Sequence, residues 1–354
     1  MEKNIAVLSG DGIGPEVINQ SLRVLDAIGT KYDHKFIYHN CLIGGISIEK
    51  TGIPISKSTL DTCLECDSIL FGAIGNPKFE NSKIRPEQGL LKLRKKMGVY
   101  CNIRPIKVYK KLFKISPIKK KYIENVDFII YRELTNGIYF GKKGLSLNQT
   151  KAYDVCNYEK KTISRIATAA FKAAVKRKKK VTLVDKANVL ETSRLWRETL
   201  KEIHLNLNLN FKEVQLDYLF IDNASMQMIF NPQKFDILLT DNMFGDILSD
   251  EASAITGSLG LIPSSSIGKK TPMYEPIHGS YPQAAGKNIA NPLGSILSVA
   301  MMLEDFGMKK ESFLIKKAVN NSIKNGVSTK DLNPKYSFST KEVGDFLINY
   351  IINN

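Results

Sequence analysis

Six short apolar runs, separated by segments with helical periodicity, constrain the fold of this chain more than any other feature. The runs lie at residues 5–8, 68–74, 128–131, 181–184, 218–221 and 236–240. Each run is brief and continuously apolar, which is typical of strands buried on both faces of a parallel sheet. After the first run, Val17, Leu22, Leu25 and Ile28 recur on one helical face. The pattern therefore predicts an α/β protein with a largely parallel sheet.

The length of the chain, 354 residues, exceeds that of an average domain, so we expect two compact lobes. It contains no run of about 18 apolar residues, which predicts that no segment spans a membrane. The opening "MEKNIAVLSGDG" leads into a strand without the apolar core of a signal peptide, so we expect a cytoplasmic protein. The five cysteines are scattered and odd in number, which argues against a disulfide framework.

The chain is strongly basic, with 51 Lys and Arg against 35 Asp and Glu and a net charge of +16. Most of the excess is lysine spread along the whole sequence. The densest run, "KRKKK" at 176–180, joins a helical segment to a strand and has no aromatic residues within it. This arrangement indicates a solvated helix end, so we expect no nucleic-acid partner.

A glycine-rich stretch, "LSGDGIGPEV", follows the first strand. Gly10 and Gly12 fit the first two glycines of the dinucleotide-binding pattern G-x-G-x-x-G. The last position of that pattern holds Pro15, although a glycine is needed there for close helix–strand packing. Proline suits the first turn of a helix, where its missing N–H costs nothing. We therefore interpret the stretch as a tight strand-to-helix turn rather than a phosphate-binding loop.

Charged residues follow several of the predicted strands, at the sheet edge where open α/β sheets bind ligands. Arg132, Lys186 and Asp222 each follow a strand, and the last run leads into "DNMFGDILSDEAS". Asp246 and Asp250 are four residues apart, so on a helix they share one face. Carboxylates are ligands that Mg²⁺ and Mn²⁺ prefer, and Asp222 is a candidate third ligand. On the residues alone, a metal site and a solvated acidic face both remain open.

Arginines form a second candidate cluster. Arg94 ends "RPEQGLLKLR", Arg104 lies in "CNIRPI" and Arg132 ends its strand. Guanidinium groups bind carboxylates in bidentate geometry. Together with a metal and Lys186, they describe a site for a polyanionic hydroxy acid. The alternative is that Arg94 and Arg104 are surface residues on a helix and on a strand edge.

These residues carry a resemblance to the isocitrate/isopropylmalate dehydrogenase family of β-decarboxylating dehydrogenases. The matching stretches keep their order from residue 10 to residue 292: "GDGIGPEV", "RPEQGLLKLR", "NIRP", "RELTNGIYFG", "DKANVL", "IDNASMQMI", "NMFGDILSDEASAITGSLG", "YEPIHGS" and "AGKNIANP". The resemblance implies a two-domain α/β fold that is not a Rossmann fold, with a mixed sheet and helices on both faces. The first domain would comprise residues 1–102 and 253–354. Residues 103–252 would form an inserted second domain that carries the dimer interface, the metal site and the catalytic residues.

The resemblance also implies an activity. It is the NAD-dependent oxidative decarboxylation of 3-isopropylmalate to 4-methyl-2-oxopentanoate and CO₂, in leucine biosynthesis. Isocitrate, homoisocitrate and tartrate remain alternative substrates within the family. A basic binding protein without catalytic activity remains an alternative of a different class.

The resemblance assigns roles to residues of this chain. Arg94, Arg104 and Arg132 would hold the two malate carboxylates. Asp222, Asp246 and Asp250 would bind Mg²⁺ or Mn²⁺. Lys186 would act as the general base, and Tyr139 would relay a proton after CO₂ leaves. In the family, the equivalents of Lys186 and Asp222 reach in from the second subunit, so we expect a homodimer with shared active sites.

Substrate choice is expected to depend on the stretch "RPEQGLLKLR". Leu90 and Leu91 suit an isopropyl group, and Val189 would complete the apolar wall. Glu87 would repel the additional carboxylate of isocitrate. Isocitrate-specific relatives instead have Ser and Asn in this stretch.

The NAD site implied by the resemblance borders "GDGIGPE" near the nicotinamide and uses the loop 278–291 for the adenosine. Gln283 stands where NAD-using relatives usually have Asp, and neither Gln283 nor Ala284 offers a charge to a 2′-phosphate. Lys287 is the nearest cation in sequence, and we expect NAD to be preferred over NADP. The candidate cofactor residues are Ile13, Gly75, Asn76, Glu87, Glu275, His278, Gly279, Ser280, Tyr281, Gln283, Ala284, Gly286, Asn288 and Asn291.

Overall fold

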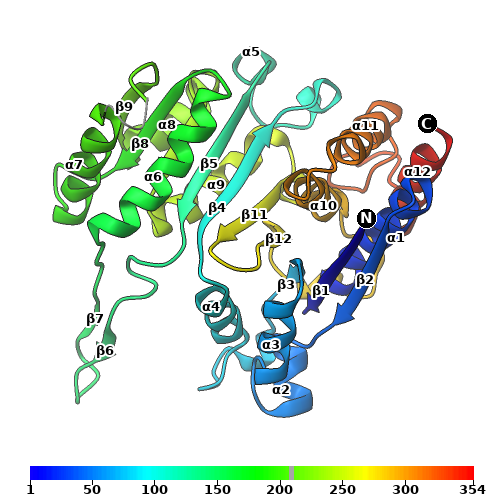
Figure 1. Ribbon diagram of the computed structural model, residues 1–354, viewed down its shortest axis with the longest axis horizontal. Coiled ribbons are helices and arrows are strands. Elements are labelled where there is room, and N and C mark those ends of the chain that lie inside the picture. The colour runs from blue at the N-terminus through cyan, green and yellow to red at the C-terminus, as the bar shows by residue number, and fades with distance from the viewer. Residues whose placement is uncertain (207–210) are drawn as a thin grey trace. The chain divides into compact units, whose positions relative to one another are not determined.

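The computed structural model describes residues 1–206 and 211–354, which form two compact units (Figure 1). Unit 1 comprises residues 1–99, 109–117 and 256–354, and it contains both chain ends. Unit 2 comprises residues 100–108 and 118–255. The predicted division into a first domain, residues 1–102 and 253–354, and an inserted second domain, residues 103–252, stays a prediction.

In unit 1, β1 (Glu2–Gly10) lies between β2 (Lys35–Asn40) and β3 (Ser68–Ala73) and is parallel to both. On the other side of β3, β12 (Met273–Pro276) pairs parallel with β3 and antiparallel with β11 (Pro263–Gly268). A Rossmann sheet has the order 3-2-1-4-5-6, in which strand 1 lies between strands 2 and 4. The position of β1 and the antiparallel β11 exclude that fold for unit 1.

The core of unit 1 is formed by long helices whose apolar faces pack on one another and on the sheet. The four long ones are α1 (Gly14–Tyr32), α10 (Leu293–Asp305), α11 (Lys309–Asn325) and α12 (Thr340–Asn353). Pro15 lies in the first turn of α1, as predicted, and a capping box between Ser339 and Glu342 starts α12. The shorter helices are α2 (Gly45–Thr51), α3 (Lys57–Glu65), α4 (Pro86–Met97) and the 3₁₀ turns Pro77–Phe79, Lys110–Lys114, Leu259–Leu261 and Pro282–Ala284.

Unit 2 contains a second run of paired strands in the order β4-β5-β10-β8-β9. Only the β4–β5 pair is antiparallel. A two-stranded hairpin, β6 (Lys143–Leu145) and β7 (Ala152–Asp154), projects from the rest of this unit (Figure 1). The bounds of the main strands are β4 (Val99–Lys107), β5 (Asp127–Glu133), β8 (Lys180–Asp185), β9 (Gln215–Phe220) and β10 (Ile237–Thr240).

The strand register of unit 2 brings the predicted charged residues to one edge of the sheet. Thr240 at the end of β10 is level with Arg132 on β5 and with Val184 on β8, and Asp185 is level with Phe220 on β9. Four strands therefore end together, and the segments that follow them start from the same edge. The helices of this unit are α5 (Lys120–Ile123), α6 (Lys160–Val175), α7 (Glu191–Leu205), α8 (Ile221–Phe230) and α9 (Asn242–Thr256), with a 3₁₀ turn at Pro232–Lys234.

The predicted fold class is confirmed, because the protein is α/β with mixed strand pairing and helices on both faces. All six predicted runs correspond to strands, although three of them extend one residue beyond the strand: Ile74 follows β3, Ile221 begins α8, and Asp236 precedes β10. The five cysteines are free thiols. Within residues 1–206 and 211–354, no helix has both the length and the apolar content required to cross a membrane.

Candidate active site

The glycine-rich stretch is a tight turn whose space is filled by the protein itself. Gly10 and Gly12 have φ of 71° and 58°, and a Cβ on either would lie 1.9 Å from the carbonyl oxygen of Ala73 or Ser280, respectively. Glycine is required because two backbones approach so closely here. The interpretation as a strand-to-helix turn is confirmed, since β1 ends at Gly10 and α1 begins at Gly14.

Asp11, between these glycines, ties three loops of unit 1 together. Its buried carboxylate accepts the backbone N–H groups of Gly45 at 2.9 Å, Ile46 at 3.0 Å and Gly75 at 3.0 Å. The next loop is attached as well, because the Ile13 N–H donates to the carbonyl of Ser280 at 2.8 Å. The turn therefore brings candidate cofactor residues from distant parts of the sequence together.

The loop 278–291 is attached to unit 1 from several directions. The N–H of Gly286 donates to the carboxylate of Glu16, and the carbonyl of Asn288 accepts the N–H of Thr340 at 3.0 Å. The amide of Asn291 donates to Asp331 at 2.9 Å. Within the described residues, the buried Nε2 of His278 has no hydrogen-bond partner. The loop is thus fixed in place while His278 retains an unused polar atom.

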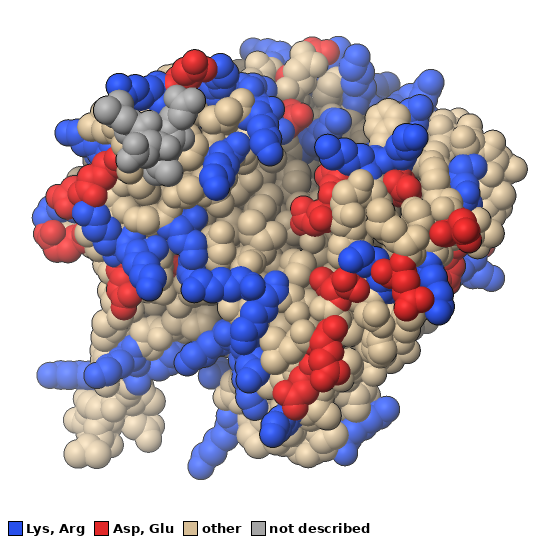
Figure 2. All heavy atoms as spheres, in the orientation of Figure 1, with Lys and Arg blue, Asp and Glu red and all other residues tan. Residues whose placement is uncertain are grey.

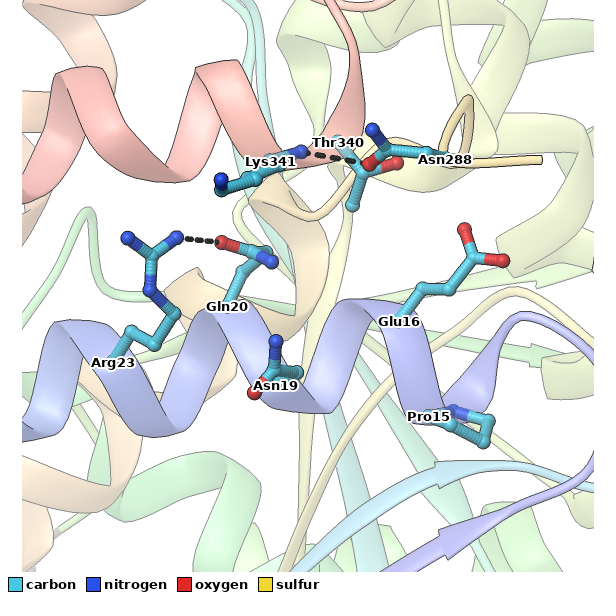
Figure 3. A pocket seen from close by; sticks show the side chains of 8 residues that line it. All are labelled: Pro15, Glu16, Asn19, Gln20, Arg23, Asn288, Thr340 and Lys341. Carbon is cyan, nitrogen blue, oxygen red and sulfur yellow. Dashed lines mark hydrogen bonds between the residues drawn. The ribbon is translucent and has the colours of Figure 1, made fainter. Parts of the chain in front are cut away.

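A hollow of about 530 Å³ lies beside this loop, between α1 and the start of α12 (Figure 3). Glu16, Gln20 and Arg23 line it from α1, and Thr340 and Lys341 line it from α12. Of the predicted site residues, only Asn288 reaches this hollow. It is therefore not the place where the structure collects the candidate substrate residues.

Helix α4 carries the unit 1 residues that were predicted to contact substrate. Arg94 pairs with Glu275 at 3.0 Å, and both side chains are largely buried, at 12% and 8% exposed. The alternative that Arg94 is a surface residue is wrong. Its buried Nε has no partner within the described residues. Leu90 and Leu91 are half-buried and Glu87 is exposed, with its carboxylate close to Gly75.

In unit 2, two arginines face the two aspartates of α9. Arg132 Nη1 donates to Asp246 Oδ1 at 2.5 Å, and Arg104 Nη1 lies 3.8 Å from Asp250 Oδ1. Both arginine side chains are buried, at 4% and 7% exposed, so the alternative that Arg104 is a surface residue is also wrong. The aspartates are more accessible, at 39% and 63%. The predicted pair of carboxylates on one helical face is present.

Tyr139 joins this cluster through Asp246. Its hydroxyl donates to Asp246 Oδ2 at 3.0 Å, while Arg132 occupies the other carboxylate oxygen. Burial raises the pKa of Tyr139, and the neighbouring negative charge of Asp246 raises it further. Tyr139 is therefore a protonated donor at neutral pH, as a proton relay requires.

Lys186 and Asp222 form a separate pair. Lys186 follows β8, Asp222 lies in the first turn of α8, and Nζ and Oδ1 are 2.6 Å apart. Asp222 is 66% exposed, and its hydrogen bond from Lys186 lowers its pKa. Val189, in the same loop as Lys186, is 63% exposed. In the part of the chain that the structure describes, no three Asp, Glu, His or Cys side chains come together as metal ligands, so Asp222 is not beside Asp246 and Asp250.

A family model described as isocitrate/isopropylmalate dehydrogenase matches residues 4–347. The chain belongs to this family. A Bacteroides fragilis protein named 3-isopropylmalate dehydrogenase is 48% identical over 356 residues, which is 99% of each chain. The protein of that name from Aquifex aeolicus is 47% identical over 352 residues, or 97% of this chain and 96% of the relative.

Solved structures of the isocitrate/isopropylmalate dehydrogenase family have the same fold. The isocitrate dehydrogenase of Methylococcus capsulatus superposes with a TM-score of 0.90, at 31% identity and 99% coverage of both chains. A β-decarboxylating dehydrogenase from Thermococcus kodakarensis gives 0.81 at 33% identity, covering 99% of this chain and 96% of the other. This member of the family is thus an enzyme of the decarboxylating dehydrogenase class.

Sequence reasoning missed Ser249, whose hydroxyl accepts a hydrogen bond from Arg104, and two asparagines that contact the arginines. Asn102 accepts a hydrogen bond from Arg104, and Asn242 accepts hydrogen bonds from Arg132. A signal was available for each asparagine. Asn102 precedes Arg104 by two residues on a strand and therefore lies on the same face. Asn242 precedes Asp246 by one helical turn.

Proposed function

We propose that the protein oxidises and decarboxylates 3-isopropylmalate with NAD as the oxidant, the reaction expected for leucine biosynthesis. The observation that carries this is the identity of 46–48% to proteins named 3-isopropylmalate dehydrogenase, along nearly the whole chain. The apolar pair on α4 agrees with it, since Leu90 and Leu91 offer no hydrogen bond to a third carboxylate. NAD, when bound, accepts the hydride from carbon 2 of the substrate.

The chemistry of the α9 residues fits a divalent cation. Asp246 and Asp250 present accessible carboxylate oxygens from one helical face, and hard oxygen donors suit Mg²⁺ or Mn²⁺. Asp222, with its lowered pKa, is an ionised third donor. A cation held there would act as a Lewis acid on the 2-hydroxyl group and a neighbouring carboxylate.

Asp222 is expected to come from a second copy of the chain. In one chain it is paired with Lys186 and lies apart from Asp246 and Asp250 within the described residues. Exposed apolar side chains follow both residues closely in the sequence, namely Val189 after Lys186, and Met226 and Phe230 on the same helix as Asp222. A homodimer would cover these apolar side chains and supply the partner subunit's Lys186 and the partner subunit's Asp222 to each site.

The remaining steps belong to residues of the chain. Arg94, Arg104 and Arg132 hold the substrate carboxylates, because each is a buried cation in a fixed position. Lys186, in its neutral amine form, removes the proton of the 2-hydroxyl as general base and becomes an ammonium group. Tyr139 delivers a proton to the carbon that loses CO₂, since its hydroxyl lies in the same cluster, 3.0 Å from Asp246 Oδ2.

The loop 278–291 fits an adenosine. His278 has a buried Nε2 without a partner among described residues, and the loop is anchored on both sides. Gln283 can hydrogen-bond ribose hydroxyls but cannot neutralise a 2′-phosphate. We therefore expect NAD to be used better than NADP, and equal kcat/KM for the two cofactors would contradict this.

A basic binding protein without activity is disfavoured. In the 176–180 run, Arg177 pairs with Asp127 and Asp236, Lys179 pairs with Glu213, and Lys180 pairs with Asp217. Figure 2 shows Lys and Arg distributed over much of the visible face with acidic side chains among them. Both observations fit a solvated surface better than a nucleic-acid site.

The deciding experiment is NADH formation with 3-isopropylmalate and Mn²⁺, run beside isocitrate and an EDTA control. Turnover with 3-isopropylmalate alone, abolished by EDTA, is the expected result. Turnover with isocitrate instead would retain the family and the metal site but overturn the interpretation of Glu87, Leu90 and Leu91. No turnover with either substrate would contradict the proposed activity.

A further inference from the structure

Each of the two buried arginines of unit 2 is held by a buried asparagine on one side and faces an aspartate of α9 on the other. The two arrangements are neighbours, because Asn102 on β4 lies directly opposite Arg132 on β5. Sequence patterns and the proposed mechanism assign no role to either asparagine. Their contacts show what each contributes.

Asn242 holds the guanidinium of Arg132 from behind. Its Oδ1 accepts Nη2 at 2.9 Å and Nε at 3.2 Å, and its backbone carbonyl accepts Nε at 2.9 Å. These contacts leave Nη1 directed at Asp246, 2.5 Å away. The flat guanidinium is thus fixed along its Nε and Nη2 edge.

Asn242 is itself held in place, so it does not follow the arginine. It is 1% exposed and is the first residue of α9. Its Nδ2 donates to the carbonyl of Asn136 at 3.3 Å, and its backbone N–H donates to the Tyr158 hydroxyl at 3.0 Å. Asn136 belongs to the loop between Arg132 and Tyr139, so the side-chain amide of Asn242 also helps to hold the loop that leads to Tyr139.

Asn102 does the equivalent for Arg104. Its Oδ1 accepts Arg104 Nε at 2.6 Å, and it is fully buried. Arg104 Nη1 then donates to the Ser249 hydroxyl at 2.5 Å and lies 3.8 Å from Asp250. Ser249 is anchored by its own hydrogen bond to the carbonyl of Asp246, at 2.9 Å.

We propose that Asn102 and Asn242 are positioning residues that fix the two arginine side chains for binding the substrate carboxylates. This inference rests on the proposed function of the site. Each asparagine removes rotamer freedom from a long side chain before the substrate arrives, so less ordering is required on binding.

The choice of asparagine rather than aspartate has a chemical reason. An amide oxygen accepts the N–H of a guanidinium without adding a negative charge. Aspartate at either position would still accept from the arginine but would add a negative charge, and at position 242 it would also lose the donor to the Asn136 carbonyl. The amide therefore adds no second carboxylate beside arginines that already face Asp246 and Asp250.

The test replaces each asparagine with leucine, which has a similar shape but no acceptor, and with aspartate, which keeps the acceptor and adds a charge. Asn4→Leu serves as a control, because the side-chain oxygen of Asn4 accepts a hydrogen bond from His39 and not from an arginine. For Asn102→Leu and Asn242→Leu, we expect kcat/KM for the substrate to fall on the order of 100-fold. The KM for NAD should stay within twofold of wild type, a split that general destabilisation would not produce.

The aspartate variants separate position from charge. In crystal structures of Asn102→Asp and Asn242→Asp, the arginines should keep their places, while the substrate KM rises about tenfold. If a leucine variant does not fold, the matching aspartate variant carries the test through its substrate KM and its Tm. A substrate KM within twofold of wild type in the folded variants would overturn the proposal, as would equal changes in the substrate and NAD constants.

A direct binding measurement keeps this test separate from the proposed function. Binding of 3-isopropylmalate to Mn²⁺-loaded protein without NAD is measured by calorimetry for wild type and each variant. If wild type turns over isocitrate instead, the same comparison is made with isocitrate, which also carries the malate carboxylates. If the proposed function is wrong, the wild-type protein will turn over a different substrate. If the inference about the asparagines is wrong, their variants will bind the substrate as well as Asn4→Leu does.

Discussion

The glycine-rich turn of unit 1 and the acidic face of α9 in unit 2 both follow a buried strand, yet the fold uses them in opposite ways. In the turn, the Asp11 carboxylate is buried and accepts three backbone N–H groups. On α9, Asp246 and Asp250 stay accessible, and each faces a buried arginine. A carboxylate satisfied by backbone donors holds loops together, whereas an accessible one beside fixed cations can bind a ligand.

The comparison shows that a motif's residue types do not decide its role. Glycines with an aspartate resemble a phosphate loop, and paired aspartates resemble a solvated helix face. What distinguishes the two motifs is whether backbone groups of the protein already satisfy the hydrogen-bonding capacity of the carboxylate. In the turn, the backbone of Ala73 and Ser280 occupies the available space.

The largest expected effect is at Asp246. Asp246→Asn removes a charge from the candidate metal site, and we expect kcat/KM to fall about 1000-fold with little change in Tm. Steady-state kinetics at several Mn²⁺ concentrations measure the loss. Asp217→Asn is the matched control, because Asp217 pairs with Lys180 at 2.8 Å outside this cluster. If Asp246→Asn retained its activity, the aspartate would only hold the structure together, as Asp11 does in the glycine-rich turn.

The complementary effect on stability is at Gly12. In Gly12→Ala, a Cβ would lie 1.9 Å from the Ser280 carbonyl, so the turn must open. We expect a loss of about 3 kcal/mol in the free energy of unfolding, measured by urea denaturation. Gly52→Ala is the control, since its φ of 76° gives similar strain but nothing lies within 4 Å of the new Cβ. Equal losses in the two variants would show that the close contact is unimportant.

Much of this comparison could be predicted from the sequence. Continuous apolar runs located the buried strands, and the four-residue spacing placed Asp246 and Asp250 on one face of α9. Strands such as β2, β11 and β12 were missed. The "PSSSIG" segment of β11, for example, is buried despite its serines. Those serines find buried partners, as when Ser264 donates to the carbonyl of Glu275, and a periodicity of apolar residues cannot show this.

The supporting residues of the site were harder to predict than the charged ones. For Asn102 and Asn242 the sequence offers only their spacing from Arg104 and Asp246, and their roles are identified by the arginine atoms that they contact. The surface alternative for Arg94 failed for a similar reason. Its partner Glu275 is 181 residues away in the sequence. Pairs over such separations depend on tertiary structure, which local patterns do not contain.

A smaller effect is expected at Asp241, which lies just before α9. Burial raises the pKa of its carboxyl to about 6, so folding favours the protonated acid. The contribution of Asp241 to the stability of the wild-type protein should therefore fall as the pH rises from about 4 through 6. Asp241→Asn keeps an acceptor for the Phe244 N–H and should be about 1–2 kcal/mol more stable at pH 7 but not at pH 4. Urea denaturation at the two pH values measures this, and a gain that does not depend on pH would show that burial of the charge is not its cause.

The smallest expected effect tests whether unit 1 also contributes a surface that meets the ligand. Leu90 is half-buried and Glu87 is exposed on α4, unlike the enclosed Asp11. In the double variant Glu87→Ser with Leu90→Ser, we expect kcat/KM for 3-isopropylmalate to fall about tenfold, because an apolar contact is lost. The KM for NAD and the Tm are measured beside it, with Leu147→Ser, a fully exposed leucine on the hairpin loop, as the control. If kcat/KM is unchanged, α4 does not form the isopropyl pocket, and the accessible side chains of unit 1 would need another role.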